Sequence, residues 1–159
     1  MNRSIIFASL FILATAALPA LAGPGEPGHG HTIFSAGVPG NPKKPSRVIV
    51  ITMREGEGKM RFSPEKVVVS KGDQIRFILK NEGALEHEFL LATVKENLEH
   101  AEVMKKFPEM EHDDPNGKRL KPSATSEILW RFTKAGEFEF ACLIPGHREA
   151  GMLGKVIVK

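Results

Sequence analysis

The sequence predicts an all-β sandwich with one inserted helix and one long loop. From residue 47 onward, short strand patterns recur with turn residues between them, which is typical of a two-sheet sandwich. Several of these patterns alternate apolar and polar residues at period two. One stretch, residues 94–107, instead has a helix-forming composition and contains no Gly or Pro. The chain of 159 residues is long enough for one domain with its own core.

The first 22 residues are typical of a secretory signal peptide. Arg3 provides a positive start, Ile5 to Leu18 form an apolar run, and Ala20-Leu21-Ala22 is a small-residue cleavage site. The apolar run is shorter than the roughly 20 residues that span a bilayer. We therefore expect cleavage after Ala22 and export to the periplasm, with no membrane span in the mature chain.

Residues 23–46 are rich in Gly and Pro and contain the sequence GHGH. A segment of this composition buries too little apolar surface to order itself, so a flexible arm is expected ahead of a domain at 47–159. His29 and His31 lie in this arm. They are either a weak, exposed Cu(II) or Zn(II) site or two solvated side chains.

The first half of the domain should contain three strand patterns. Residues 48–51 form an apolar run, and the glycine-rich turn EGEGK, residues 55–59, follows it. Residues 62–69 lead into a turn at Lys71-Gly72-Asp73, after which Ile75, Phe77 and Leu79 alternate with more polar positions. The last two patterns and their turn together predict a β-hairpin.

The second half begins with alternating apolar residues at 128–132, followed by a turn at 134–136. Phe138, Phe140 and Cys142 then alternate, so the Cys142 thiol should point inward with the two rings. Residues 156–158 supply the last strand.

Between these halves, Val94 to Phe107 is the expected helix, and Pro108 to Pro122 is a polar loop whose Asp, Asn, Gly and Pro residues favour turns. Four side chains in these segments are either additional copper ligands or ordinary core and loop residues. They are His100, Met104, Met110 and His112.

The stretch FEFACLIPGHREAGM, residues 138–152, contains the chain's single cysteine. Cys142, His147 and Met152 follow the spacing C-x4-H-x4-M, with a Pro-Gly turn that lets them converge. With one more histidine, they make the His2Cys set with a weak axial Met that selects copper for electron transfer. His87, in LEHEF, is the candidate. Each residue alone fits a core or turn position, but their joint spacing favours copper.

Two segments resemble the cupredoxins, the blue-copper family. CLIPGHREAGMLGKVIV is similar to the family's C-terminal ligand loop and last strand, and MRFSPEKVVVSKGDQIRFILKNEGALEHEF is similar to the strands leading to its first histidine ligand. Together they lie within residues 60–91 and 124–159. The resemblance implies a Greek-key β-sandwich and one type 1 copper per chain. The implied ligands are His87, Cys142, His147 and an axial Met152.

One residue departs from the family pattern. Glu88 follows the first histidine, where several members carry an Asn or Ser that ties the two ligand segments together. The resemblance also implies that His147 lies near the surface in an apolar patch, which gives the electron a short path. The expected hydrophobic shell is Phe89, Phe140, Leu143, Ile144, Pro145 and Leu153.

Several function classes are excluded. The formal net charge of +3 is spread over interspersed acidic and basic residues, which does not make a nucleic-acid surface. A multicopper oxidase needs histidines beside the cysteine, where this chain has Ala141 and Leu143, and a dinuclear purple site needs a second cysteine. A cysteine nucleophile would leave Met152 unexplained. We therefore expect a copper protein that is not an enzyme.

Two functions remain open, and both use the same copper ligands. The first is copper tolerance, by sequestration or redox handling of periplasmic copper, and the resemblance is nearest to periplasmic copper-tolerance cupredoxins. The second is one-electron transfer to a cytochrome or another redox partner. The extra His and Met residues favour tolerance, because a simple carrier has no need of them. A monomer is expected in either case.

Overall fold

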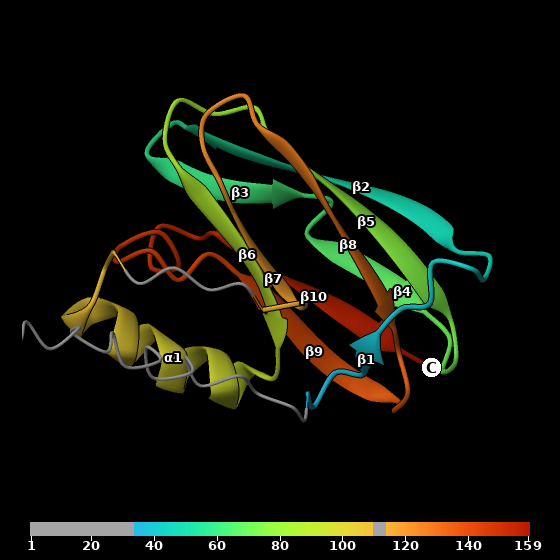
Figure 1. The fold of residues 1–159 in the computed structure, drawn as a ribbon. Coiled ribbons are helices and arrows are strands. Elements are labelled where there is room, and N and C mark those ends of the chain that lie inside the picture. The colour runs from blue at the N-terminus through green and yellow to red at the C-terminus, as the bar shows by residue number, and fades with distance from the viewer. Residues whose placement is uncertain (1–33, 110–113) are drawn as a thin grey trace, which may run out of the picture.

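The computed structural model describes residues 34–109 and 114–159, which form two packed β-sheets with a helix on the outside (Figure 1). The predicted β-sandwich with one inserted helix is confirmed for this part of the chain. The predicted signal peptide, His29, His31, Met110 and His112 lie outside the described residues.

The first sheet has the strand order β1-β8-β5-β2-β3. β2 runs parallel to β5, and β5 runs antiparallel to β8. β2 and β3 form a hairpin whose turn residues, Glu57 and Gly58, both have positive φ, as a tight two-residue hairpin turn requires. The strands are β1 (Val38–Pro39), β2 (Arg47–Gly56), β3 (Lys59–Ser63), β5 (Gln74–Asn81) and β8 (Thr125–Arg131).

The second sheet has the order β4-β10-β9-β6-β7. β10 pairs with β4 in parallel and with β9 antiparallel, and β6 lies between β9 and β7. The strands are β4 (Lys66–Val69), β6 (His87–Ala92), β7 (Gly117–Leu120), β9 (Gly136–Ala141) and β10 (Leu153–Val158).

The hairpin predicted around Lys71-Gly72-Asp73 is wrong. The turn is present, but it carries the chain from β4 in the second sheet to β5 in the first. The expected strand at 62–69 is likewise divided, because β3 ends at Ser63 and β4 begins at Lys66 in the other sheet. A period-two pattern shows which residues face the core, and both sheets share that core, so the pattern does not identify a strand's partner.

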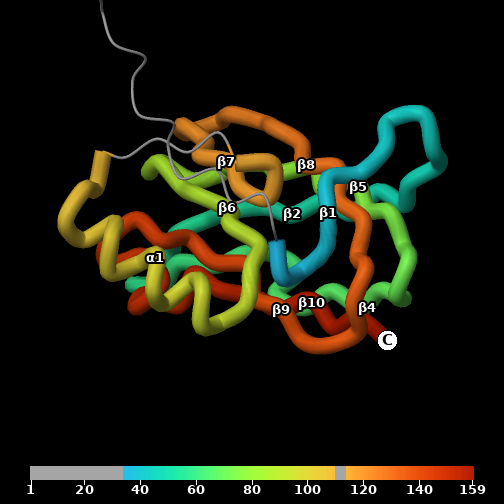
Figure 2. The backbone as a smooth tube through the Cα atoms, turned by 60° about the horizontal axis from the view of Figure 1, so that its bottom comes forward, coloured from blue at the N-terminus to red at the C-terminus, as the bar shows by residue number. Residues whose placement is uncertain are grey.

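The helix α1 (Val94–Lys106) matches its predicted range to within one residue. Thr93 is the N-cap residue and forms a capping box with Glu96. The Thr93 hydroxyl accepts the Glu96 backbone N–H, and the Glu96 carboxylate accepts the Thr93 backbone N–H. Figure 2 shows the helix beside β6, and its contacts are with β6 and β9. With the core on the other side, all six residues of β6 are buried. Met104 is fully buried in the helix–sheet contact.

The predicted loop 108–122 contains a short strand that sequence analysis missed. Its four residues, Gly117–Leu120, pair with β6 at the edge of the second sheet. Such a short segment, GKRL, carries no clear alternation of apolar and polar residues, so only its tertiary pairing defines it.

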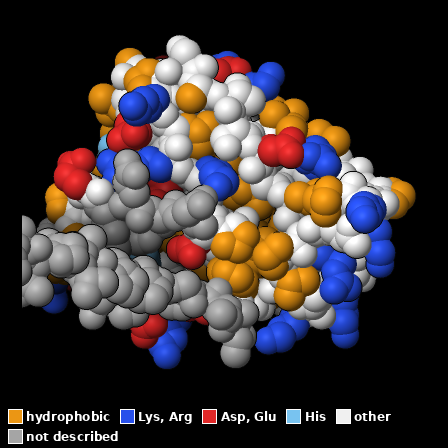
Figure 3. All heavy atoms as spheres, in the orientation of Figure 1, with side chains coloured by type: hydrophobic (Ala, Val, Ile, Leu, Met, Phe, Trp, Pro, Cys, Tyr) orange, Lys and Arg blue, Asp and Glu red, His pale blue; other side chains and the backbone are white. Residues whose placement is uncertain are grey.

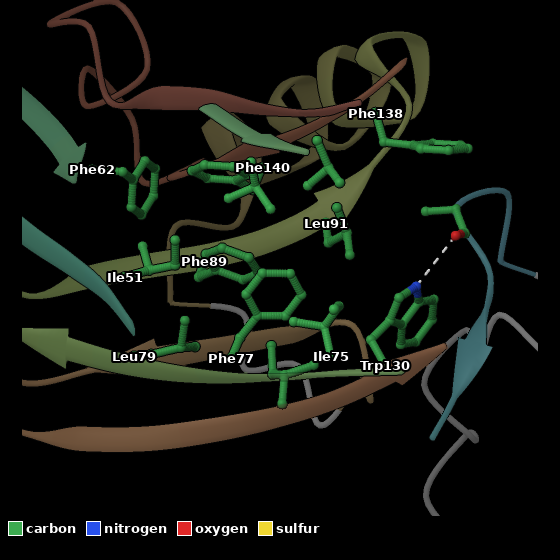
Figure 4. Close-up of a cluster of buried hydrophobic side chains, with 14 of the residues drawn as sticks. Ile51, Phe62, Ile75, Phe77, Leu79, Phe89, Leu91, Trp130, Phe138 and Phe140 are labelled. Carbon is green, nitrogen blue, oxygen red and sulfur yellow. Dashed lines mark hydrogen bonds between the residues drawn. The ribbon is translucent and has the colours of Figure 1, made fainter. Parts of the chain in front are cut away.

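Aromatic side chains fill the space between the sheets (Figure 4). Phe89 and Phe140 stack with ring centroids 5.2 Å apart, and Phe62 meets Phe140 edge-on at the same centroid distance. Phe89 lies on β6 and Phe140 on β9, so the rings tie together the two strands that position the candidate site.

Residues 34–46, expected to belong to the flexible arm, pack on the first sheet instead. β1 pairs with β8, and the indole Nε1–H of Trp130 donates to the Ala36 carbonyl (Figure 4). The Phe34 ring contacts Trp130 edge-on at 5.4 Å. Because these partners lie far along the chain, the local composition of the segment did not reveal the contact.

The surface in Figure 3 shows acidic and basic side chains on the same face, with hydrophobic side chains between them. This mixture agrees with the interspersed charge of the sequence. Among residues 34–109 and 114–159, no helix has the length and apolarity needed to cross a membrane.

Candidate metal centre

Two neighbouring strands of the second sheet bring the predicted ligands together. His87 is the first residue of β6, and Cys142 directly follows the last residue of β9. These strands are antiparallel, with Leu90 opposite Ala141. The loop from Cys142 to β10 then passes His147 and returns to Met152.

Three side chains of this group meet at one point. His87 Nδ1 lies 3.3 Å from His147 Nδ1, and the Cys142 sulfur lies 3.3 Å from the same His147 nitrogen. All three donor atoms lie within 4.8 Å of one another. His87 and Cys142 are fully buried, whereas His147 is partly exposed. Within the part of the chain that the structure describes, this is the one such cluster of three or more His, Cys, Asp or Glu side chains.

The donor set fits a copper ion. Three ligand atoms that each lie about 2 Å from one ion, in a trigonal plane, are about 3.5 Å apart. The contacts of His147 Nδ1 are close to that value. Two imidazoles and one thiolate are the trigonal set of blue-copper sites.

The loop that carries Met152 is closed by its own backbone. The Cys142 N–H donates to the Met152 carbonyl at 3.1 Å, and the Met152 N–H donates to the His147 carbonyl at 3.0 Å. Gly146 and Gly151 both have positive φ, which a side chain would disfavour. Met152 is fully buried in the same core cluster as Cys142. Its backbone is thus hydrogen-bonded to two of the other candidate ligands.

The Cys142 sulfur accepts a hydrogen bond from the Glu88 backbone N–H at 3.2 Å. Burial raises the pKa of the Cys142 thiol to about 12, although the backbone N–H groups of Glu88 and Ile144 act in the opposite direction. The thiol is therefore protonated at neutral pH when no metal is bound. The two N–H groups are ready to stabilise a thiolate once a cation takes the proton's place.

Glu88, the residue that departs from the family pattern, joins the two ligand segments here. Its side chain is buried, and its carboxyl oxygen accepts the Leu143 backbone N–H at 3.3 Å. Burial raises the pKa of the Glu88 carboxyl, which favours the neutral acid. The segment that begins with His87 is therefore tied to the segment that follows Cys142.

Glu55 contacts the candidate site, and sequence analysis missed it. Its carboxylate lies 2.9 Å from His87 Nε2 and also accepts the backbone N–H groups of Ala84 and Leu85. Partial burial acts to raise the pKa of Glu55, but the bonds from His87 and the two backbone groups outweigh it and lower the pKa to about 2. No sequence signal marks this residue, because it lies on β2, in the opposite sheet.

The segment before His87 is organised by Asn81. Its side-chain amide donates to the carbonyls of Leu85 and Leu120, and its oxygen accepts the Gly83 N–H at 3.0 Å. This buried side chain fixes the turn that leads into β6.

The expected hydrophobic shell is graded from core to surface. Phe89, Phe140 and Leu143 are buried, Ile144 is partly buried, and Pro145 and Leu153 are exposed. His147 lies between the buried and the exposed members of this shell. Its pKa is lowered mainly by partial burial and, to a smaller extent, by the nearby His87. The predicted position of His147 near the surface is confirmed.

A buried carboxylate anchors the far side of the ligand loop. Glu139 on β9 forms an ion pair with Arg148 at 2.9 Å and accepts a hydrogen bond from the Asn97 side chain of α1 at 3.2 Å. Arg148 follows His147 directly, so the helix and the loop share one anchor point.

Two of the other candidate ligands, Met104 and His100, belong to the described residues, and neither joins this cluster. Met104 packs with Leu90, Ala141 and Leu143, which confirms its interpretation as a core residue. His100 lies on the helix, at a separate hollow between α1 and β6.

The family pattern for copper-binding proteins of the plastocyanin/azurin family matches residues 49–159. The chain belongs to that family. The predicted family resemblance is thereby confirmed, and the four predicted ligand positions, 87, 142, 147 and 152, lie within the matched range.

Two relatives cover nearly the whole chain. One, described as a copper-resistant cuproprotein CopI from Rubrivivax gelatinosus, is 42% identical and covers 93% of this chain and 94% of its own. The CopI of Pseudomonas aeruginosa strain PAO1 is 33% identical, with 99% and 98% covered. Among solved structures, auracyanin B has a TM-score of 0.62 at 17% identity, covering 78% of this chain and 96% of its own, which shows a shared fold.

Proposed function

We propose that this protein holds one type 1 copper through His87, Cys142, His147 and an axial Met152, and that it acts in copper tolerance. The convergence of two imidazole nitrogens and one buried thiol supports the first three ligands. The burial of Met152 and its backbone bond to His147 support the fourth. When bound, copper supplies a one-electron couple between Cu(II) and Cu(I).

The chain's own residues supply a stiff binding site. His87 stands on a strand that is buried on both faces, and Cys142 follows the neighbouring strand. The bonds of Glu88 and Glu139 tie the ligand loop to β6 and to α1. Ligands that are already held in place need little rearrangement when the charge at the site changes.

The observation that carries the tolerance role is the full-length similarity to proteins described as copper-resistant cuproproteins. We propose export to the periplasm after removal of residues 1–22. His29 and His31 are proposed to bind additional copper weakly. The mature protein is proposed to have no oxidase activity, since Ala141 and Leu143 stand where a multicopper oxidase has histidines beside its cysteine. It is also proposed to be a monomer.

The test is a deletion strain grown with and without added copper. We expect hypersensitivity to copper that is restored by the wild-type gene and not by Cys142→Ser, together with normal respiration at low copper. Purified mature protein should bind more than one copper, and the double change His29→Ala with His31→Ala should lower that number while leaving the thiolate absorption unchanged.

The opposite pattern would support a dedicated electron carrier. That pattern is one copper per chain, rapid electron exchange with a cytochrome near His147, and a respiratory defect in the deletion strain at low copper.

A further inference from the structure

We propose that Glu55 is a positioning residue for the copper site, whose carboxylate fixes the ring of His87 and shifts the site's preference toward Cu(II). The inference rests on the proposed ligand role of His87. It adds a residue from the first sheet to a site whose candidate ligands all come from the second.

The contacts of His87 indicate which ring nitrogen would bind the metal and which would donate a hydrogen bond. Nδ1 lies 3.3 Å from His147 Nδ1, while Nε2, on the other side of the ring, lies 2.9 Å from a Glu55 carboxylate oxygen. When Nδ1 binds a cation, Nε2 carries the proton, and this N–H donates a hydrogen bond to the Glu55 carboxylate. A carboxylate in this position fixes the ring orientation and makes the imidazole a stronger donor.

The Glu55 carboxylate is itself held firmly. It accepts the Leu85 N–H at 2.8 Å and the Ala84 N–H at 2.5 Å, in addition to His87. Both amides belong to the turn that leads into β6. Glu55 thus holds the ring of His87 and the backbone just before it with one group.

The Glu55 carboxylate occupies the space that a side chain at position 83 would fill. A Cβ atom on Gly83 would lie 1.8 Å from one Glu55 oxygen and 2.7 Å from its carboxyl carbon. A side chain at position 83 would therefore push the carboxylate away. The contact between Glu55 and His87 therefore depends on the glycine at position 83.

The charge of Glu55 is also uncompensated by a basic side chain. Its one ion-pair contact among the described residues is His87, whereas the nearby Glu82 is paired with Arg54 at the surface. The oxidised ion carries one more positive charge than the reduced ion. The Glu55 side chain is partly exposed, but the His87 ring between it and the candidate site is fully buried. A fixed negative charge on the far side of that ring therefore stabilises Cu(II) more than Cu(I).

The test compares the reduction potential and visible spectrum of four copper-loaded proteins: wild type, Glu55→Gln, Gly83→Ala and the control Glu82→Gln. Glu55→Gln keeps the shape of the side chain and removes its charge. We expect the ratio of Cu(II) to Cu(I) affinity to fall about tenfold, which is a rise of about 59 mV in potential. Glu82→Gln removes an equal charge that is already paired and exposed, and should leave the potential close to wild type.

Gly83→Ala is the sharper variant, because it changes no charge. Its methyl group should displace the Glu55 carboxylate and raise the potential in the same direction. Combined with Glu55→Gln it should add nothing further, since both changes remove one interaction. Circular dichroism of each apoprotein checks the fold, and Gly83→Ala provides the measurement if Glu55→Gln does not fold.

A wild-type potential in both Glu55→Gln and Gly83→Ala would overturn the proposal, and so would an equal shift in Glu82→Gln. Failure of the ligand assignment looks different. In that case the wild-type protein itself would lack the thiolate-to-copper absorption, or His87→Ala would leave copper binding unchanged.

Discussion

The backbone N–H of Glu88 points at the sulfur of Cys142 across 3.2 Å, while the Glu88 side chain accepts the N–H of Leu143. One residue thus supports the thiol and the chain that follows it. The consequence is that the geometry of the two ligand segments is set before any metal binds.

The change Cys142→Ser should abolish the intense thiolate-to-copper absorption and leave the sandwich folded. A serine hydroxyl can still accept the Glu88 N–H, so we expect the apoprotein to lose only about 1 kcal/mol of unfolding free energy. Visible spectroscopy and thermal unfolding measure the two effects. A folded variant that keeps the absorption band would contradict the assignment of Cys142.

The change Met152→Leu should retain copper and raise the reduction potential, because loss of a weak axial donor disfavours Cu(II). Leucine is close to methionine in volume, so the cost in unfolding free energy should stay below about 1.5 kcal/mol. Protein-film voltammetry gives the potential. A lowered potential would show that Met152 is not the axial ligand.

Copper binding should release about one proton from Cys142. Its pKa of about 12 means that the thiol is protonated well above neutral pH, and the metal ligand must be the thiolate. The apparent affinity should therefore rise about tenfold per pH unit from pH 7 to pH 9, a range in which His147, with its lowered pKa, is already neutral. Calorimetry in two buffers with different ionisation heats counts the proton. Equal release by Cys142→Ser would refute this origin.

Glu88 should tolerate glutamine and not leucine. Burial raises the pKa of the Glu88 carboxyl, which favours the neutral acid, and glutamine keeps an oxygen that can accept the Leu143 N–H. Leucine leaves that buried N–H without an acceptor, at a cost of about 1–3 kcal/mol. Urea unfolding of the two apoproteins tests the difference. A Glu88→Gln protein as unstable as Glu88→Leu would argue that the charge is needed.

The sequence predicted most of the sandwich, because its strands carry the period-two pattern of a shared core. The spacing of Cys142, His147 and Met152 was readable, since one short loop holds them all. What escaped prediction depends on pairing across the fold. The partner sheets of β4 and β5, the strand β7 and the contact of Phe34 with Trp130 are each decided by residues distant in the chain.

The residues that hold the candidate ligands also differ in how far the sequence could predict them. Glu88 stands beside a predicted ligand, so its importance could be expected even though its partner could not. Glu55 is 32 positions before His87 and follows no ligand motif. Its contact exists because β2 carries it to the end of the sandwich where β6 begins, which only the packing of the two sheets determines.

Burial of β6 on both faces should also slow the hydrogen exchange of its backbone amides. A strand that has neighbours on both edges, a helix on one face and the core on the other gives water no local route to its amides. In hydrogen–deuterium exchange, the central amides of β6 should exchange only when the whole domain unfolds, and those of the exposed positions near Pro145 much sooner. His87 would then be fixed to the slowest-opening part of the molecule, whereas the His147 amide, which donates to the Ile144 carbonyl at 3.0 Å within the ligand loop, should exchange at a rate set by that loop alone.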